Sequence, residues 1–102
     1  MSTPPQETET RQIDFTRAER WVVHHVLTTA VDDAIDNDES PAMWVLTLLE
    51  TIEAGSETLT RQQGRNLHDA LTTYAAHTET PRCDVSNALT VVAELKERFN
   101  FA

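Results

Sequence analysis

Apolar side chains recur at helical spacing early in the chain, directly after a polar group that can cap a helix. Thr16 stands three residues before Glu19, the spacing of a capping box, in which each side chain accepts a hydrogen bond from the other residue's backbone N–H. On a wheel of 100° per residue, the apolar side chains within about 60° of Leu27 are Val23, Ala30, Val31 and Ala34. The pattern predicts an amphipathic helix from Thr16 to about Ile35.

A second helix is predicted after the polar run of residues 36–39. Ser40 and Pro41 offer an N-cap and the proline that is favoured in a first helical turn. The apolar face that follows comprises Val45, Leu46, Leu49 and Ile52. Gly55 is typical of a left-handed residue just past a helix end, so we expect this helix to stop there.

The same order of features returns in the second half of the chain. Thr60 and Gln63 form another capping-box pair, and the inner face of the helix that follows contains Leu67, Leu71, Tyr74 and Ala75. Thr80 and Pro81 then start a fourth helix that is predicted to reach about Arg98. Its inward side chains are expected to be Val85, Leu89, Val92 and Phe99. Because no segment alternates apolar and polar residues, the sequence predicts an all-α fold with no sheet.

The two halves share residues at matching positions, which indicates an internal repeat. When residues 15–32 are aligned with residues 59–76, six of eighteen positions are identical. The identical pairs are Thr16 and Thr60, Arg17 and Arg61, His24 and His68, Leu27 and Leu71, Thr28 and Thr72, and Thr29 and Thr73. One helical hairpin cannot bury its apolar face alone. We therefore expect a four-helix bundle built from two pseudo-symmetric helical hairpins, residues 13–55 and 59–100.

The chain of 102 residues fits one small domain. Residues 1–11 lack apolar periodicity and are predicted to be a disordered acidic tail before a single helical domain at 12–102. Cys83 is the only cysteine, so neither an intrachain disulfide nor a thiolate cluster is expected. The longest nearly apolar run, AMWVLTLL, is too short to cross a bilayer, and no signal segment is visible. We expect a cytoplasmic protein that is not embedded in a membrane and carries no cofactor.

The charge balance is strongly acidic, with 17 Asp and Glu residues against 8 Lys and Arg residues, and Lys96 is the only lysine. An acidic protein is normally repelled by nucleic acid. The near-absence of lysine with abundant acids also matches adaptation to a cytoplasm rich in salt. At molar salt the Debye length is only about 3 Å, so acidic proteins can approach DNA. The charge therefore disfavours a nucleic-acid partner without excluding one.

The histidines raise the question of a metal site. His24 and His25 are adjacent, and adjacent helical residues diverge by about 100°, so the two cannot easily hold one ion. The wheel places His24 at the edge of the core, where a hydrogen bond to a polar group is the ordinary role, and His25 toward solvent. His24 and His68 occupy the same position in the two repeats and could converge with a carboxylate between them. They are the candidates for a metal or proton-linked site, although no HExxH or ExxH spacing supports them.

A surplus of large apolar side chains lies outside the predicted core faces. Its members are Trp21, Val22, Val26, Met43 and Trp44. Because monomers seldom expose extended apolar patches, these residues are the candidates for a subunit contact or a partner surface. The alternative is that they close over helix ends within the monomer.

Two other residues bear on packing and chemistry. Gly64 stands inside a predicted helix at a cost of roughly 1 kcal/mol, which suggests either a close helix approach or a loosely wound first turn. Cys83 precedes the acidic Asp84 near a helix start but has no histidine or second cysteine beside it in the sequence. The exposed pattern of the carboxylates gives no general acid in an apolar cleft. We therefore expect no enzymatic activity.

The capping pairs, FTRAERWVVHHVL, the TIEAG helix ending and LTRQQGRNLHDALTTYAAHTETPRCDV resemble a family of small uncharacterised haloarchaeal proteins, a domain of unknown function. The resemblance covers nearly everything after Ile13 and implies a helical fold and a salt-rich cytoplasm, but no catalytic residues.

Three functional hypotheses follow from the sequence. The first is a non-enzymatic protein-interaction or structural module, either a homodimer or a binder of an unidentified protein. The second is a DNA-binding or transcription-accessory protein, because LTRQQGRNLHDAL resembles the first helix of a helix-turn-helix unit. The third is a metal-binding helical protein that uses His24 and His68.

Overall fold

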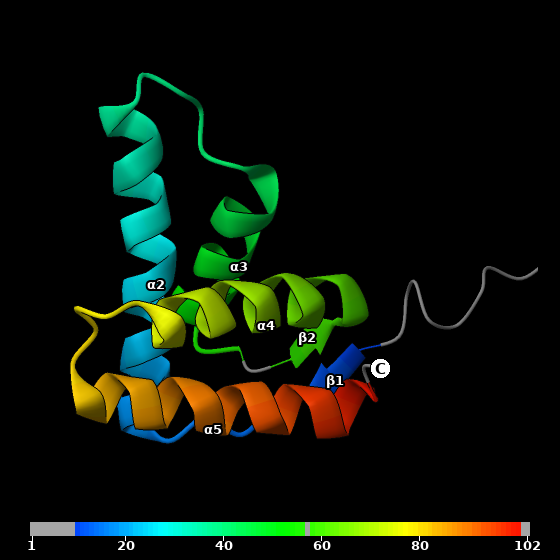
Figure 1. The fold of residues 1–102 in the computed structure, drawn as a ribbon. Helices are drawn as coiled ribbons and strands as arrows, with labels where there is room; N and C mark the ends of the chain where they lie inside the picture. The colour runs from blue at the N-terminus through cyan, green and yellow to red at the C-terminus, as the bar shows by residue number, and fades with distance from the viewer. Residues whose placement is uncertain (1–9, 57, 101–102) are drawn as a thin grey trace, which may run out of the picture.

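The computed structural model describes residues 10–56 and 58–100, which form four helices and two short strands (Figure 1). In chain order the elements are β1 (Thr10–Gln12), α2 (Arg17–Asp36), α3 (Met43–Glu53), β2 (Thr58–Thr60), α4 (Arg61–Ala76) and α5 (Arg82–Phe99). The order strand, helix, helix therefore occurs twice. The fold is mostly helical, as predicted, but it also contains a small sheet.

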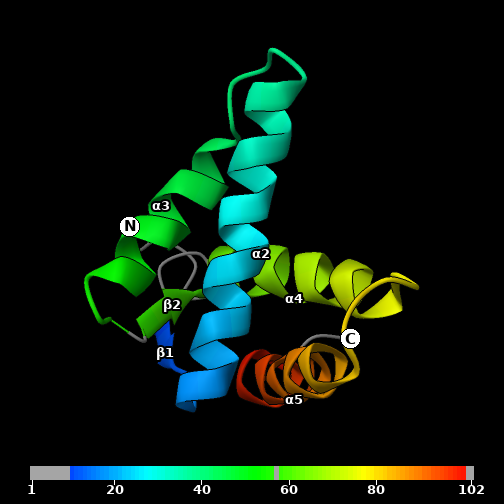
Figure 2. The same ribbon diagram turned by 90° about the vertical axis from the view of Figure 1, so that its left-hand side faces the viewer.

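The helices form two pairs, α2 with α3 and α4 with α5, and the second pair is in more extensive contact than the first. α4 and α5 run antiparallel and lie against each other along their length, whereas α2 crosses both of them (Figures 1 and 2). α3 returns beside α2, and the ends of α2 and α3 that face their connecting loop project beyond α4. The molecule is consequently elongated, with extents of 47 × 31 × 26 Å.

Both predicted capping boxes are present. In α2 the Glu19 backbone N–H donates to the Thr16 hydroxyl over 3.1 Å, and the Thr16 N–H donates to the Glu19 carboxylate over 2.9 Å. Thr60 and Gln63 make the equivalent pair of bonds at the start of α4, with the same two lengths. These local bonds satisfy backbone donors that the first helical turn leaves open.

The two predicted starts at Ser40–Pro41 and Thr80–Pro81 are wrong in detail. α3 begins at Met43 after Ala42, and no side chain caps it. α5 begins directly after Pro81, again without a side-chain cap. Thr80 instead donates its hydroxyl hydrogen over 2.7 Å to the backbone carbonyl of Tyr74, at the end of α4. The predicted end of α3 is confirmed, because Gly55 adopts φ +84°.

The expectation of no sheet is wrong, because β1 and β2 pair antiparallel. Thr10 lies opposite Thr60, and Arg11 lies opposite Leu59. Each strand has only three residues, too few for an alternating pattern to be recognised, and the first falls partly within the stretch predicted as tail. Thr10 and Arg11 are therefore part of the fold, while the rest of the predicted tail, residues 1–9, lies outside the described residues.

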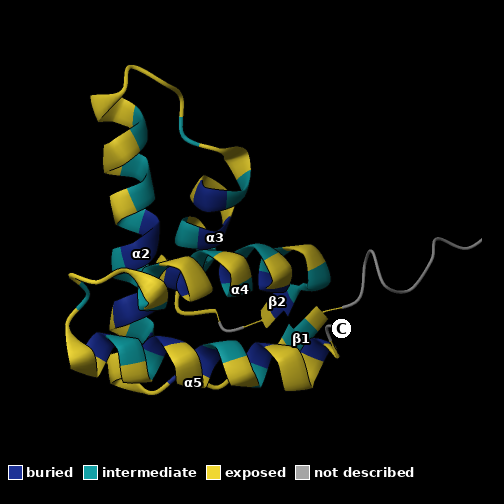
Figure 3. Ribbon diagram, viewed as in Figure 1, coloured by how far each residue is buried: buried dark blue, intermediate teal, exposed yellow. Residues whose placement is uncertain are grey.

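The core lies where α2 crosses α4 and α5. Its fully buried large side chains are Ile13, Val22, Val23, Leu27, Leu48, Leu59, Leu67, Leu71, Val91 and Leu95. Figure 3 shows burial concentrated in this region, whereas the projecting ends of α2 and α3 are mostly exposed or intermediate.

The predicted inner faces of α3 and α5 are rotated from the observed ones. In α5 the buried residues are Asp84, Ala88, Val91, Leu95 and Phe99, whereas the predicted Leu89 is exposed and Val85 and Val92 are only partly buried. In α3 the buried residues are Val45, Leu48 and Ile52, and the predicted Leu46 is exposed. Contacts at both ends determine the rotation of α5, because Phe99 packs against Gly64 and Asp84 bonds to Tyr74.

Gly64 permits the close approach that was one of its two expected roles. It is buried in the first turn of α4, and a Cβ atom at this position would lie 2.6 Å from Cε2 of Phe99. Such a distance is far shorter than an ordinary carbon contact. The ring of Phe99 can therefore sit on α4 because residue 64 has no side chain.

Candidate functional site

The structure divides the predicted interface residues into two groups. Val22 and Val26 lie in the core, so they are not available for a subunit contact. The physical reason is that α2 contacts α3, α4 and α5, and the three neighbours together bury a wider arc of α2 than one hairpin partner would. Trp44 is half-buried against the core, whereas Trp21 is 58% exposed and Met43 is 76% exposed.

Three exposed apolar side chains remain on the parts of α2 and α3 that flank their connecting loop. Ile35 is 62% exposed near the end of α2, and Met43 and Leu46 are exposed in the first turn of α3. We call these three residues the hairpin tip. The residues between the two helices are almost all exposed, and they include the acidic Asp38 and Glu39 (Figure 3).

The structure gives His24 and His68 different carboxylate partners. Nε2 of His24 lies 3.0 Å from Oε2 of Glu53, so this pair joins α2 to the end of α3. Nδ1 of His68 lies 3.0 Å from Oδ1 of the adjacent Asp69 on α4. Within residues 10–56 and 58–100 there is no group of three or more His, Cys, Asp or Glu side chains that could hold a metal ion. Each of the two histidines thus lies beside a carboxylate of its own, Glu53 for His24 and Asp69 for His68.

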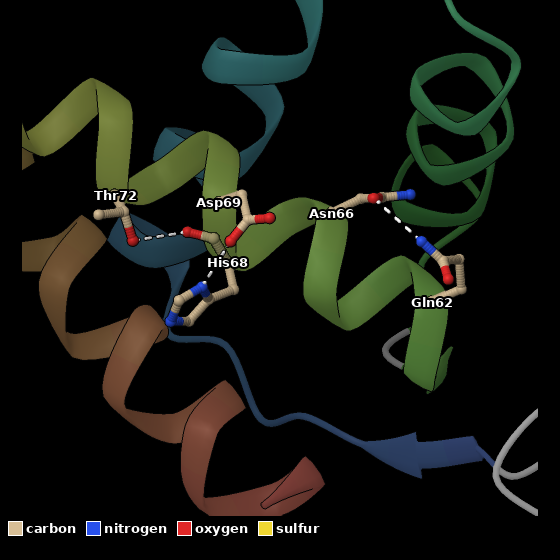
Figure 4. A network of polar contacts seen from close by, with 5 residues as sticks. All are labelled: Gln62, Asn66, His68, Asp69 and Thr72. Carbon is tan, nitrogen blue, oxygen red and sulfur yellow. Dashed lines mark hydrogen bonds and ion pairs between the residues drawn. The ribbon is translucent and has the colours of Figure 1, made fainter. Parts of the chain in front are cut away.

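Figure 4 shows the surroundings of His68 on α4. The Thr72 hydroxyl donates to the backbone carbonyl of His68 over 2.7 Å, and Gln62 donates to Asn66 over 3.2 Å nearer the start of the helix. Each of these bonds joins residues of the same helix that are four positions apart. The contacts drawn in Figure 4 all join residues of α4.

A groove that the sequence did not predict lies between α2, α4 and the connection from α4 to α5. We call it the α2–α4 groove; its volume is about 470 Å³. Its lining residues are His25, Val26, Thr29, Ala30, Asp33, Ala70, Thr73, Tyr74, His77, Glu79, Thr80 and Pro81. The volume is within the range of small-molecule sites, roughly 300 to 1,000 Å³.

His25 lies in this groove rather than toward open solvent as the wheel predicted. Its ring stacks on Trp21 with centroids 5.2 Å apart and planes inclined by 5°. The other neighbour is Tyr74 on α4, whose ring meets His25 edge to face at 5.8 Å. The wheel position was correct for an isolated helix, but α4 crosses α2 close enough to cover that side. The rings of His25 and Tyr74 thus form an aromatic wall of the groove, and Trp21 stacks on His25 from outside it.

Tyr74 and Asp84 connect the groove to α5. The Tyr74 hydroxyl donates over 2.7 Å to Oδ2 of Asp84, which is buried in the first turn of α5. Burial of the phenol, and next the hydrogen bond to Asp84, raise the pKa of Tyr74 to about 12. A carboxylate near a helix start is favoured by the positive end of the helix dipole, which explains how Asp84 can lie in this buried position.

A second cleft, of about 610 Å³, lies on the other side of Trp21, between the start of α2 and the end of α3. It is lined by Arg17, Arg20, Trp21, His24, Ile52, Glu53 and Gly55. The His24–Glu53 pair occupies its polar side, so the carboxylate and the imidazole already satisfy each other there. This cleft is therefore less prepared for a ligand than the α2–α4 groove.

One feature of the sequence could have indicated the groove. His25, Thr29 and Asp33 stand four residues apart and thus form a stripe on one helix face. From the sequence only His25 is placed, toward solvent, because the position of α4 and of the α4–α5 connection cannot be obtained from helical spacing. Tyr74 was expected in the core, and it does pack against the core while its ring also lines the groove.

No described helix is long and apolar enough to cross a membrane.

The elements and the groove define a mostly helical domain in which a two-stranded sheet joins two helix pairs, with a partly aromatic groove beside α2. The model of a family of unknown function, DUF7853, matches residues 13–96. The chain therefore belongs to the DUF7853 family. No curated protein and no solved structure matches it.

Proposed function

We propose that this chain is a non-enzymatic interaction module that pairs with a second copy of itself through the hairpin tip. The observation that supports the proposal is the exposure of Ile35, Met43 and Leu46 on the projecting ends of α2 and α3. Exposed apolar side chains contribute no burial free energy to the fold of the monomer. Burial against another surface removes that apolar area from solvent.

We take a second copy of the chain as the partner. In a dimer with twofold symmetry the same surface of each subunit faces the other, so one apolar surface can be covered by its own counterpart. Each hairpin tip would then cover the apolar side chains of the other. The acidic residues around the tip, among them Asp36, Asp38 and Glu39, lie close to their counterparts in such a pair and repel them. The dimer is therefore expected to form at high ionic strength, where that repulsion is screened, and to dissociate in dilute buffer.

The test is light scattering coupled to size exclusion in molar KCl, at tens of micromolar protein. We expect a dimer, and we expect Met43→Glu and Leu46→Glu to give monomers. Leu89→Glu is the matched control, because Leu89 is also exposed but lies on α5, away from the tip. A wild-type monomer at all salt concentrations, or equal effects of all three variants, would contradict the proposal.

We place a DNA-binding role second. It rests on the helix-turn-helix resemblance of α4, yet α4 and α5 pack along each other as an antiparallel hairpin, without a recognition helix that projects from a short turn. A DNA-binding helix needs basic side chains that are open to phosphate, but Arg98 on α5 lies 4.0 Å from the carboxylate of Glu94. A metal-binding role of His24 and His68 gains no supporting geometry from their separate carboxylate partners.

We also propose that the chain works in the salt-rich cytoplasm of a haloarchaeon. The support is the resemblance of its capping and core motifs to haloarchaeal proteins and its net charge of −9 with a single lysine. A melting temperature that is the same in dilute and molar salt would contradict this proposal.

We further propose that the two strand–helix–helix halves are pseudo-symmetric hairpins that arose by duplication. The repeated element order and the two capping boxes at equivalent positions, Thr16 with Glu19 and Thr60 with Gln63, support this origin. The pairs differ in packing, because α4 and α5 are in more extensive contact than α2 and α3. An experimental structure whose halves fail to superpose on their Cα atoms, with Thr16 over Thr60, would contradict the duplication.

A further inference from the structure

We propose that the α2–α4 groove binds a small organic cation of the alkylated ammonium class, with its carbon body against the groove floor and its charge beside Asp33 and Glu79. This site is separate from the hairpin tip, and it does not depend on dimer formation. Three properties of the lining lead to this ligand class: an apolar floor, an aromatic wall and a rim whose fixed charges are all negative.

The floor of the groove consists of short or compact apolar side chains. Val26 and Ala30 come from α2, Ala70 comes from α4, and Pro81 precedes α5. Alanine at residues 30 and 70 leaves space where a larger side chain would fill the angle between the crossing helices. A compact carbon body can occupy about 470 Å³ here and displace water from apolar surface.

The wall of the groove is formed by His25 and Tyr74, whose rings contact each other edge to face. Trp21 stacks on His25 from outside the groove and restricts the imidazole. The bond from Tyr74 to Asp84 and the bond from Thr80 to the Tyr74 carbonyl restrict the phenol and its backbone. The face of a tyrosine ring attracts ammonium groups within about 6 Å, so Tyr74, held in this way, is prepared for a cation before the ligand arrives.

The charges of the lining favour a cation and disfavour an anion. The carboxylates are Asp33 from α2 and Glu79 from the α4–α5 connection, and the lining contains no lysine or arginine. Neither carboxylate has an ion-pair partner within residues 10–56 and 58–100. α4 also ends at the groove, directly before the lining residue His77, without a basic residue in its last turn. The negative end of its helix dipole thus adds to the negative rim.

The experiment compares choline with 3,3-dimethyl-1-butanol, which has nearly the same shape but no charge, by NMR titration of ¹⁵N-labelled protein at constant KCl. We expect choline to shift the amide signals of the groove residues and to bind at least several-fold more tightly than the neutral alcohol. Equal affinities would show that the groove is only an apolar pocket, and absence of choline-dependent shifts in the groove would also overturn the proposal.

Two variants test the rim. Asp33→Asn and Glu79→Gln are each expected to weaken choline binding roughly two- to fivefold, the range of partly exposed charge pairs. Asp32→Asn is the matched control, since it removes the same charge from the adjacent exposed position of α2, outside the lining. Equal losses in Asp32→Asn and Asp33→Asn would mean that only the net charge of the protein matters, which contradicts a specific site.

A second pair of variants tests the aromatic wall. Tyr74→Phe keeps the ring and is expected to keep most of the affinity, whereas Tyr74→Leu removes the ring and is expected to lose it. The ratio between these two variants reports the contribution of the ring itself. If Tyr74→Leu does not fold, the rim variants, which alter exposed residues, still decide the proposal.

Discussion

The phenol of Tyr74 at the end of α4 donates a 2.7 Å hydrogen bond to the buried carboxylate of Asp84 at the start of α5. The two residues stand on opposite sides of the α4–α5 connection, so the bond closes the helix pair at this end. Because the chain contains one tyrosine, every property of tyrosine measured in solution reports on this bond.

We predict that the tyrosine of the folded protein ionises with a midpoint near pH 12, which absorbance at 295 nm can measure directly. The raised pKa of about 12 against the ordinary 10.0 means that the folded state holds the proton more tightly than the unfolded state. The contribution to stability is therefore complete below pH 10 and is lost as the pH rises from 10 to 12. Circular dichroism at each pH verifies that the protein is still folded.

Asp84→Asn is the matched variant for this titration. It keeps a hydrogen-bond acceptor beside the phenol but removes the negative charge, so the pKa of Tyr74 should fall toward 10. Tyr74→Phe is expected to cost about 1 to 2 kcal/mol at neutral pH, since it leaves the buried carboxylate without this donor. An unchanged tyrosine midpoint in Asp84→Asn would show that burial alone raises the pKa.

We predict that Gly64→Ala destabilises the protein by about 1 kcal/mol. The new methyl group would meet the ring of Phe99 at 2.6 Å, and such overpacking typically costs about 1 to 3 kcal/mol. Against this stands a gain of roughly 1 kcal/mol because alanine favours the helix. Urea denaturation measures the difference in the free energy of unfolding.

The same substitution in a Phe99→Leu background separates the two effects. With the smaller side chain at residue 99 the clash is relieved, and Gly64→Ala should then become neutral or stabilising. An equal cost in both backgrounds would mean that the Phe99 contact is not the reason for glycine at this position.

We predict that Glu94→Gln raises the melting temperature at neutral pH. Partial burial raises the pKa of Glu94, and the nearby Glu19 raises it further, whereas the N–H of Asp14 opposes the shift. A carboxyl group with a raised folded pKa stabilises the fold most when protonated, and this contribution is lost as the pH rises from below 4.5 through the raised folded value. Glutamine keeps the acceptor for Asp14 without the charge.

The advantage of Glu94→Gln over wild type should accordingly increase from acidic to neutral pH. Glu97→Gln, at an exposed position of the same helix, is the control for loss of one negative charge. A difference that is constant with pH, or the same for both variants, would contradict a role of Glu94 ionisation.

We predict that lowering KCl from molar to millimolar concentration lowers the melting temperature by at least several degrees. With a net charge of −9, mutual repulsion extends over a longer range when salt is dilute. For a domain of about 100 residues, 1 kcal/mol corresponds to a shift of roughly 4 to 8 °C. Sucrose in place of KCl serves as the control, because it does not screen charge.

The sequence was sufficient where structure depends on neighbours along the chain. The structure confirms the predicted capping boxes at Thr16 and Thr60 and the left-handed Gly55. Their bonds and dihedral angles involve only residues within three positions of one another along the chain. The rotation of α5 was not predicted, since it follows from the distant contacts of Asp84 and Phe99. Helical spacing does not contain this information.

The candidate site was likewise predictable only where it depends on residues near one another in the sequence. The sequence identified Trp21 and Met43, which are exposed, but it also selected Val22 and Val26, which the crossing of three helices buries. The α2–α4 groove could not be predicted from the sequence, because its lining residues come from α2, α4 and the α4–α5 connection, which meet only in the folded chain. Periodicity places a residue on one side of its own helix, and the fold decides what lies opposite.

The pairing of β1 with β2 has a consequence for how the chain is made. β1 leaves the ribosome before the four described helices, yet its partner Thr58–Thr60 is synthesised only after α3. Until then Ile13 and the inner side of α2 lack the α4 and α5 surfaces that cover them in the finished molecule. The apolar side chains of the first half are therefore exposed to solvent while the second half is translated. Synthesis rate and chaperone access should thus influence the yield of folded protein more than the small size of the chain suggests.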